Sequence, residues 1–240
     1  MTQSRKLKAD FHLHTSEDPE DLFIRHSSTE LIDKAAEYGF DVLAITLHNR
    51  QLYTDYLKNY ALDRGILLIP GMEATIEGKH ILLINMNCDL SKIRRIQDLN
   101  RYTGEDTLVI AAHPFFPDSK CLGSKLESNI EIFNAIEYSH FYLKKINFNE
   151  KAVQVATKYQ LPLVGTSDTH ILHQFGKTFS LVEADQEIGS VIEAIKKRRV
   201  EVVSQALTPT YAATTMLQLK SGIIKKIERK LKKFFYGPSR

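Results

Sequence analysis

Cysteine is scarce in this sequence, and the signals of secretion are missing. Only Cys88 and Cys121 occur among 240 residues, and there is no Cys-x-x-Cys pair. Two cysteines are too few for a disulfide framework. No apolar run reaches transmembrane length, and the start, MTQSRKLKAD, lacks the apolar segment of a signal peptide. These absences predict a reduced, cytoplasmic protein.

The signatures of covalent catalysis and of common nucleotide-binding loops are also missing. The sequence has no P-loop, no G-x-G-x-x-G motif and no serine nucleophile elbow, and it shows no repeat of fixed period. Hydrophobic residues make up 43% of the chain, which is enough for a sizeable core. We therefore expect a folded enzyme or binding protein that does not use a serine nucleophile.

What the sequence does contain is an alternation of strand-like and helix-like segments up to about residue 204. Repeated units of this kind favour an α/β protein with a parallel sheet, open or closed into a barrel. The turn signal Glu77-Gly78 joins two of the strands, GILLIPGMEAT and KHILLINM. Helices are expected in STELIDKAAEYG, near residues 52–64, 91–101 and 148–159, and in IGSVIEAIKKRR.

The C-terminal segment differs from the body in charge. The net charge is only +3, but eight cations and a single acid, Glu228, lie between residues 220 and 240. Leu219, Ile223, Ile227, Leu231 and Phe234 recur at helical spacing, which predicts a basic amphipathic helix. It could contact an anionic membrane at its periphery, contact nucleic acid, or pack on the body or a second subunit. We predict two units, residues 1–207 and 208–240.

Imidazoles and carboxylates gather where the strand-like segments end. His12 and His14 alternate on a strand and so share a face. The carboxyl ends of parallel strands meet at one edge, where ligands bind. Imidazole and carboxylate donors without thiolates suit Mn, Zn or Fe, and this set is large enough for two or three ions. The members in chain order are His12, His14, Asp18, His48, Glu73, His80, His113, Glu137, His140, Asp168 and His170.

Ordered motifs resemble those of the PHP (polymerase and histidinol phosphatase) superfamily of metal-dependent phosphoesterases. DFHLHT resembles its first motif, AITLHN its second, and GMEAT followed by KHILLI a third. AAHP and GTSDTH match the later His and the closing Asp-x-His, so that the resemblance runs from about residue 9 to 171.

The resemblance implies a distorted (β/α)7 barrel with a trinuclear site. His12, His14, Glu73 and Asp168 would hold one ion, Glu73 would bridge to a second ion on His80 and His113, and Asp18, His48 and His170 would hold the third. The implied activity is hydrolysis of a phosphomonoester, or of a phosphodiester in a nucleotide, oligonucleotide or short RNA. A metal-bound hydroxide is the expected nucleophile.

Two departures from the family pattern affect the third ion. Leu47 stands where the family usually has an Asp that supports the following His, which predicts a less firmly oriented His48. The stretch SEDPED offers Glu17, Asp18 and Asp21 as the carboxylate, and spacing favours Asp18.

The residues expected to act on the substrate follow from the same motifs. We expect His48, His113, Asp168 and His170 to take part in catalysis, with a neighbouring His protonating the leaving group. A phosphate needs a cation nearby, and Arg25, Arg50 and Lys120 follow motif strands, although each could be a solvated surface charge. His140 could contact the substrate, bind metal or be an ordinary loop residue.

Two other functions remain open at the level of sequence. With Leu47 in the second motif, the chain could be a non-catalytic module that keeps a partial metal site and binds RNA or an anionic membrane. The same ligands could also polarise a carbonyl, as in a metallohydrolase that cleaves a C–N bond.

Overall fold

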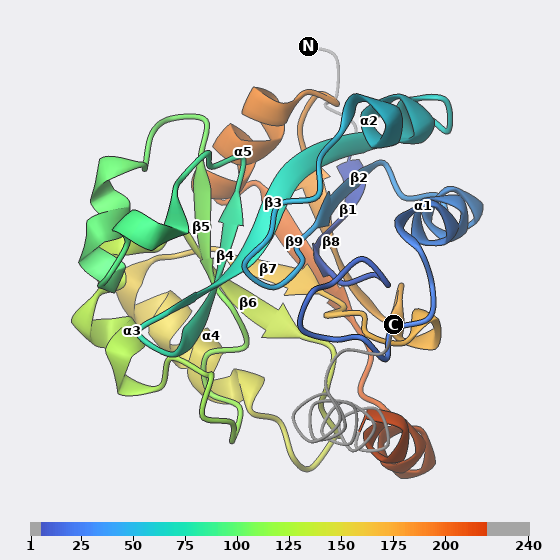
Figure 1. Ribbon diagram of the computed structural model, residues 1–240. Coiled ribbons are helices and arrows are strands. Elements are labelled where there is room, and N and C mark those ends of the chain that lie inside the picture. Colours follow the sequence, from blue (N-terminus) through green and yellow to red (C-terminus); the bar gives the residue numbers. More distant parts are fainter. Residues whose placement is uncertain (1–5, 220–240) are drawn as a thin grey trace, which may run out of the picture.

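One mixed sheet forms the centre of the protein. The computed structural model describes residues 6–219 (Figure 1). The strand order is β7-β6-β5-β4-β3-β2-β1-β8-β9. The strands are β1 (Lys6–Leu13), β2 (Val42–Ile45), β3 (Leu67–Ile76), β4 (Lys79–Ile84), β5 (Leu108–Ala111), β6 (Ala135–Ser139), β7 (Leu163–Thr166), β8 (Thr178–Glu183) and β9 (Val200–Ser204).

The sheet curls until its two ends meet, which gives a nearly closed barrel. Ser180 Oγ in β8 donates a hydrogen bond of 3.0 Å to Gly165 O in β7. Beyond β7, Thr169 forms a parallel bridge with Leu13, and His14 N donates to Thr169 O at 3.1 Å. The end of the seventh strand is thereby brought beside the end of the first. The predicted α/β barrel class is confirmed, while the count of seven strand–helix units stays a prediction.

Two strands run against the others, which the expectation of a parallel sheet did not include. β4 is antiparallel to β3 and β5, and β8 is antiparallel to β1 and β9. The reason at β4 is local. Glu77 and Gly78 both have positive φ, 49° and 74°, as the two-residue turn of a hairpin requires. Such a short turn cannot make the crossover between parallel strands.

Helices cover the outside of the sheet, with α1 and α2 on one side and α3 and α4 on the other (Figure 1). Ser27 and Glu30 form a capping box at the start of α1. The helices are α1 (Ser28–Glu37), α2 (Asp55–Leu62), α3 (Ser124–Ser128), α4 (Asn149–Tyr159) and α5 (Ile188–Lys196). α5 packs Val191, Ile192 and Ile195 onto a buried cluster that includes side chains of β1, β4, β5 and β7.

The helix expected over residues 91–101 is replaced by two 3₁₀ turns, η1 (Leu90–Lys92) and η2 (Ile96–Arg101). Asp89 accepts a hydrogen bond from Ser91 N, and Asp98 accepts from Arg94 N and Arg95 N. Such local bonds from Asp side chains compete with the hydrogen bonds of an α-helix. The prediction of a continuous helix was wrong for this reason.

Residues 209–219 are helical and lie against the body (red in Figure 1). Tyr211 Oη donates to His173 O at 2.9 Å, and Thr215 Oγ1 lies 3.1 Å from His173 Nε2. Ala212 and Thr215 are buried. Ile223 and the rest of the predicted basic helix lie outside the described residues. Among residues 6–219, no helix has both the length and the apolar character needed to span a bilayer.

Candidate metal centre

The structure brings the predicted imidazoles and carboxylates to one end of the barrel. His12 and Glu73 lie within β1 and β3, and His80 lies at the start of β4. Because β4 runs antiparallel, its first residues reach the same edge as the last residues of the parallel strands. The others follow directly after strands: His14, His48, His113, Asp168 and His170.

Four of these side chains form a cage of donor atoms. His12 Nε2 is 3.4 Å from Glu73 Oε1 and 3.3 Å from Asp168 Oδ1. His14 Nε2 is 3.4 Å from Glu73 Oε2 and 3.5 Å from the same Asp168 oxygen. Ligands about 2.1 Å from a tetrahedral ion stand about 3.4 Å from one another. The cage therefore has the dimensions of a divalent metal site.

Glu73 also faces three further imidazoles. Its Oε1 is 3.3 Å from His113 Nε2 and 2.7 Å from His80 Nδ1, and its Oε2 is 3.0 Å from His48 Nε2. The contact with His80 is short but is not a hydrogen bond, because Glu73 Oε1 has no hydrogen-bond partner. The two carboxylate oxygens of Glu73 thus contact different imidazoles, as expected of a carboxylate that bridges two metal ions. Among the described residues, four overlapping groups of three side chains each offer donor atoms that lie within 4.8 Å of one another inside the group. They are His12–His14–Glu73, His12–His113–Asp168, His48–Glu73–His80 and His14–His48–His170.

Five donor atoms of this cluster are buried and have no hydrogen-bond partner: His12 Nε2, His14 Nε2, Glu73 Oε1, His80 Nε2 and Asp168 Oδ1. Buried polar atoms without partners are costly and rare. Divalent cations bound among these atoms would satisfy them, and the mixture of nitrogen and oxygen donors suits transition metals. The residues present therefore fit a site for divalent metal ions.

The charges of the cluster point to the same conclusion. Burial alone would lower the pKa of His12, but the carboxylates of Asp168, Glu137 and Glu73 raise that pKa well above its usual value. Burial would raise the pKa of Glu73, yet His12 and the neighbouring imidazoles hold it well below its ordinary range. Positive charge is thus strongly favoured between these groups, as protons or as a cation.

Two buried carboxylates stand behind the imidazoles and fix how they point. Asp18 Oδ2 lies 2.9 Å from His14 Nδ1 and 3.0 Å from His48 Nδ1, and it also accepts from His48 N at 2.9 Å. Glu137 Oε1 lies 2.9 Å from His12 Nδ1. Each contact occupies Nδ1 and leaves Nε2 aimed into the cluster, which is the usual support of a metal-binding histidine.

The consequence of Leu47 differs from the expectation. Leu47 is fully buried in an apolar cluster with Leu31 and Leu57, so it cannot support His48. Asp18 does so instead, through both the ring and the backbone amide of His48. His48 is therefore held firmly despite the altered second motif, and the expectation of a poorly oriented His48 was wrong.

The three candidate acids of SEDPED have different surroundings. Asp18 uses its second oxygen to accept from Glu20 N and Asp21 N. Asp21 Oδ2 lies 3.0 Å from His170 Nε2. Glu17 accepts from Ser28 N and Ser28 Oγ at the start of α1. The geometry therefore gives Asp18 a supporting position and puts Asp21 next to His170, while a ligand role for Asp18 stays a prediction.

Sequence reasoning left out the buried Asp10 and placed Glu137 only among the strand-end residues, without a role of its own. Asp10 accepts from His12 N and Ser167 N, each at 3.2 Å, and burial raises its pKa to about 7. Glu137 accepts from His113 N and from Thr166 Oγ1 in addition to its contact with His12. The available signal was an acid inside a predicted strand, two residues before His12 in the case of Asp10 and within AIEYS in the case of Glu137.

Strained backbone occurs at two residues of the cluster. His113 and Asp168 have φ of 27° and 44°, in the left-handed region that non-glycine residues seldom adopt. Strain of this kind persists where the surrounding contacts impose it, and it concentrates at functional sites. Here it turns both side chains from the strand ends towards the cluster.

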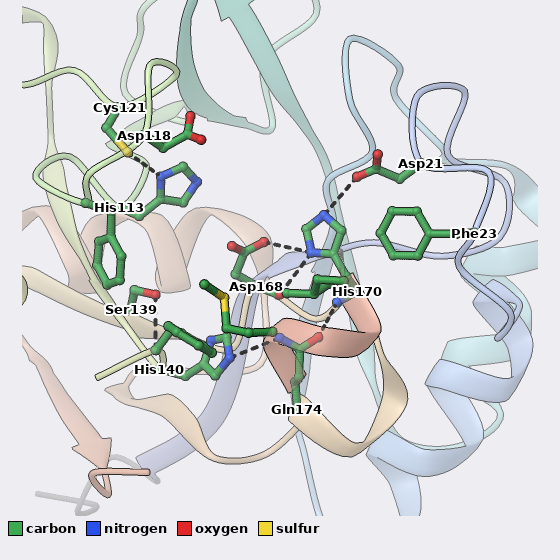
Figure 2. Close-up of a pocket in the computed structure, with 14 residues that line it drawn as sticks. Asp21, Phe23, His113, Asp118, Cys121, Ser139, His140, Asp168, His170 and Gln174 are labelled. Atoms are coloured by element: carbon green, nitrogen blue, oxygen red, sulfur yellow. Dashed lines mark hydrogen bonds and ion pairs between the residues drawn. The ribbon is translucent and has the colours of Figure 1, made fainter. Parts of the chain in front are cut away.

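A pocket of about 330 Å³ opens beside the cluster (Figure 2). Three of the residues predicted to take part in catalysis line it, namely His113, Asp168 and His170, whereas His48 does not. Figure 2 shows His113 and His170 on opposite sides, with Asp168 between them. The pocket is the space in which a substrate can reach the donor atoms.

The predicted substrate-binding residues are divided by the structure. His140 lines the pocket, where it is buried, lies 3.1 Å from Gln174 Nε2 through its Nε2, and has its pKa lowered to about 4 by burial. Arg25, Arg50 and Lys120 do not line it. Arg25 and Arg50 are exposed, and Arg50 donates to Glu17 O at 3.3 Å. The interpretation of these three cations as surface charges therefore accounts for their positions.

Comparisons with known proteins agree with this fold. Residues 147–200 match the PHP-associated family model. A two-domain protein from Bacteroides vulgatus that contains a predicted PHP-like metal-dependent phosphoesterase superposes with a TM-score of 0.66 at 21% identity. The match covers 85% of this chain and 66% of that one, so the chain spans slightly less than two thirds of its length. No curated protein matches the sequence.

Two further structures are similar at low identity. PsfC from Pseudomonas syringae gives a TM-score of 0.60 at 17% identity, over 93% of this chain and 99% of that one. A protein from Bifidobacterium adolescentis assigned as a metal-dependent phosphoesterase gives 0.52 at 16%, over 70% and 89%. The chain shares its fold with these structures, and the match of residues 147–200 to the PHP-associated model supports the resemblance to the PHP superfamily.

Proposed function

We propose that this protein is a hydrolase that cleaves phosphate esters with the help of divalent metal ions. The observation that carries the proposal is the set of five buried, unpartnered donor atoms at the mouth of a PHP-type barrel. The pocket beside them is lined by Asp168, which carries one of these atoms, and by His113 and His170 of the same cluster. The substrate would be a phosphomonoester or a phosphodiester. The site would bind two or three divalent ions, and Mn, Zn and Fe are the candidate metals.

We assign the ligands by position and geometry. His12, His14, Glu73 and Asp168 would hold one ion, and His80 and His113 would share Glu73 with a second. His48 and His170 would hold a third ion together with a carboxylate, for which Asp21 and Asp18 are the candidates. Such ions stabilise negative charge on phosphoryl oxygens and make a bound water more acidic.

The protein's own residues would orient the donors and move a proton. Asp18 and Glu137 occupy the Nδ1 atoms of His14, His48 and His12, so that the Nε2 atoms stay directed at the cluster. His170 Nε2 faces Asp21 at the pocket wall, and the carboxylates of Asp168 and Asp21 raise the pKa of this imidazole against the effect of burial. With two ions bound, by the groups around His12 and His80, His170 is free of metal and can hold the proton that the leaving oxygen needs.

Metal analysis combined with simple substrates tests this proposal. We expect at least two ions per chain after purification with Mn, Zn or Fe, and hydrolysis of p-nitrophenyl phosphate or bis(p-nitrophenyl) phosphate. His14→Asn should lose metal and activity together. His173→Asn is the matched control, because His173 lies outside the cluster and contacts Thr215 instead. A chain without metal and without activity would contradict the proposal.

The same experiment separates the two other functions that the sequence leaves open. One ion or none, with no turnover, would favour a non-catalytic module that binds RNA or a membrane. Bound metal with cleavage of amides and not of phosphate esters would favour a C–N hydrolase. The firm support of His48 by Asp18 removes the main reason for preferring the non-catalytic module.

A further inference from the structure

The pocket beside the metal cluster is adjoined by an apolar pocket, and the two together are called the groove. A second pocket of about 250 Å³ shares Phe141 and Met216 with the first one. The groove runs between the loop of residues 141–148 and the helix of residues 209–219. Its far part is lined by Tyr142, Leu143, Ile146, Phe148, Pro209 and Ala212.

The carboxylate and imidazole groups of the lining are confined to the pocket beside the cluster, whose wall also includes the apolar Phe23, Phe116 and Leu219. Asp21, Ser139, His140 and Gln174 lie in the pocket next to the cluster. Beyond Phe141 and Met216, the lining side chains are apolar apart from Tyr142. Within residues 6–219, no Arg or Lys lines either pocket. The groove therefore offers a charged end at the cluster and a long end without charges.

This separation restricts what a substrate can carry beyond its phosphate. A sugar or nucleoside would place several hydroxyl or ring groups against walls that cannot hydrogen-bond them, which costs binding energy. An alkyl chain loses no hydrogen bonds there, and its transfer from water to an apolar wall is favourable in free energy. Large apolar side chains are exposed at the rim of the groove, namely Ile146, Phe148 and Met216. Exposed apolar patches of this kind are typical of binding sites for apolar ligands.

Building on the proposed phosphoesterase function, we propose that the substrate is a phosphate ester of a long-chain aliphatic alcohol. The phosphate lies at the metal cluster, and the chain lies in the groove between Phe141, Met216 and Phe148. Lys144 and Lys145, which are exposed beside Ile146, fit the anionic surface of lipid aggregates from which such a substrate would be drawn.

Binding of n-alkylphosphonates to the full chain tests the proposal without any turnover, because their P–C bond is not hydrolysed by this chemistry. Calorimetric titration from ethyl- to decylphosphonate, below micelle-forming concentrations, should show Kd falling by up to about fourfold for each methylene that enters the groove. A Kd that does not change with chain length overturns the proposal. A flat series that becomes steep in Ile227→Asp would identify the chain's own segment 220–240 as the occupant, and it also overturns the proposal.

Two neighbouring residues of one helix give a matched pair of variants. Met216 is 44% exposed and lines both pockets, whereas Leu217 is 68% exposed and lines neither. Met216→Ser should reduce the dependence of Kd on chain length, as should Ile146→Ser, and Leu217→Ser should leave it unchanged. Equal effects of the substitutions at residues 216 and 217 would show that the chain binds elsewhere and would overturn the proposal.

Turnover then separates this inference from the proposed function. Hydrolysis of ethyl phosphate and p-nitrophenyl phosphate, with no gain for decyl phosphate, would leave a phosphoesterase standing and overturn the long-chain substrate. Steep chain-length dependence in phosphonate binding without hydrolysis of any phosphate ester would support the apolar site and refute the phosphoesterase.

Discussion

At the scale of single residues, the buried carboxylates behind the imidazoles determine the character of the site. Asp18 touches the rings of both His14 and His48, and Glu137 touches His12. A histidine whose Nδ1 is held by a carboxylate is fixed in one tautomer and is a stronger metal ligand. These acids are as much a part of the donor set as the nitrogen atoms they orient.

Replacing Asp18 by Asn should therefore weaken metal binding without removing a histidine. One oxygen of Asp18 contacts both rings and the other accepts from Glu20 N and Asp21 N, so the NH2 group of an asparagine would lose one of these two sets of contacts, and the negative charge beside both rings would be lost as well. We expect metal affinity to fall about 10- to 100-fold. Competition with a chromogenic chelator measures this change directly.

Glu17→Gln is the control for that substitution. Glu17 is adjacent in sequence and carries the same charge, but it contacts Ser28 and none of the histidines. The metal affinity of the Glu17→Gln variant should stay close to that of the unmodified protein. If both variants lose affinity equally, the effect arises from net charge and not from support of His14 and His48.

His140 should make the stability of the protein sensitive to acid. Burial lowers its pKa to about 4 in the folded state, below the usual value of 6.5. The unfolded chain therefore takes up a proton first as the pH falls, so the stabilising contribution is complete above about pH 6.5 and is lost towards about pH 4. Between about pH 7.5 and about pH 5 we expect a loss of about 2 kcal/mol that His140→Gln does not show.

Denaturant unfolding of both proteins at a series of pH values, in the presence of a chelator, measures this contribution as a difference. The cluster itself also titrates, but it does so in both proteins and cancels to the extent that the sites are independent. If the free energy of unfolding changes with pH in the same way in both proteins, His140 is not a buried, neutral residue.

At the scale of secondary-structure elements, β7 passes very close to β8 and β9 at Gly165. A Cβ atom on Gly165 would stand 2.6 Å from Phe179 O and 3.0 Å from Val202 Cγ1. Only glycine lets these strands approach so closely. The approach brings the end of β7, with Asp168 and His170 just beyond it, to the mouth of the barrel.

Gly165→Ala should therefore destabilise the fold, because backbone must move to make room. We expect a loss of about 1–3 kcal/mol in the free energy of unfolding. Gly189→Ala is the control, since a Cβ there meets only Asp106 Oδ1 at 3.5 Å and lies in α5. That substitution should leave stability unchanged or raise it by up to about 1 kcal/mol. Chemical denaturation of both variants measures the two effects, and equal stability of the two would contradict the close contact.

The elements show where sequence patterns suffice and where they do not. Strands with continuous apolar runs, such as β2 and β5, and the capped helix α1 could be located from the sequence. Residues 90–101 could not, because the bonds from Asp89 and Asp98 to nearby amides outweigh the helical pattern. The direction of β8 also could not be read, since antiparallel pairing with β1 depends on how the whole sheet closes.

At the scale of the whole molecule, the motifs predicted which residues would meet but not what surrounds them. His12, Glu73 and Asp168 could be assigned to one site, because strand ends of an α/β fold share an edge. The roles of Asp18 and Glu137 required the actual contacts. The pocket wall at Met216 required the packing of residues 209–219 on the body, which no motif encodes.

Removing metal should lower the stability of the entire chain. The proposed ligands come from β1, β3 and β4 and from the segments after β2, β5 and β7, so an ion bound there would tie most of the sheet together. Adding Mn or Zn to chelator-treated protein should raise Tm, and an ion at about 100 times its Kd stabilises the folded state by about 2.7 kcal/mol.

Calcium at the same concentration is the control, because it prefers all-oxygen sites and is poorly suited to imidazoles. Differential scanning calorimetry of the three samples checks the expectation. An equal increase of Tm with calcium would indicate general screening of acids instead of binding at the histidine cluster.

The bridge between the first strand and the segment after β7 has a consequence for biosynthesis. Asp10 and Ser167, which hold this junction together, are 157 positions apart. While the ribosome is still translating the middle of the gene, His12 and His14 have already emerged, but Asp168 does not yet exist. The proposed ligand set is complete only once residues 168–170 have been synthesised, so the full site cannot assemble before that point of translation.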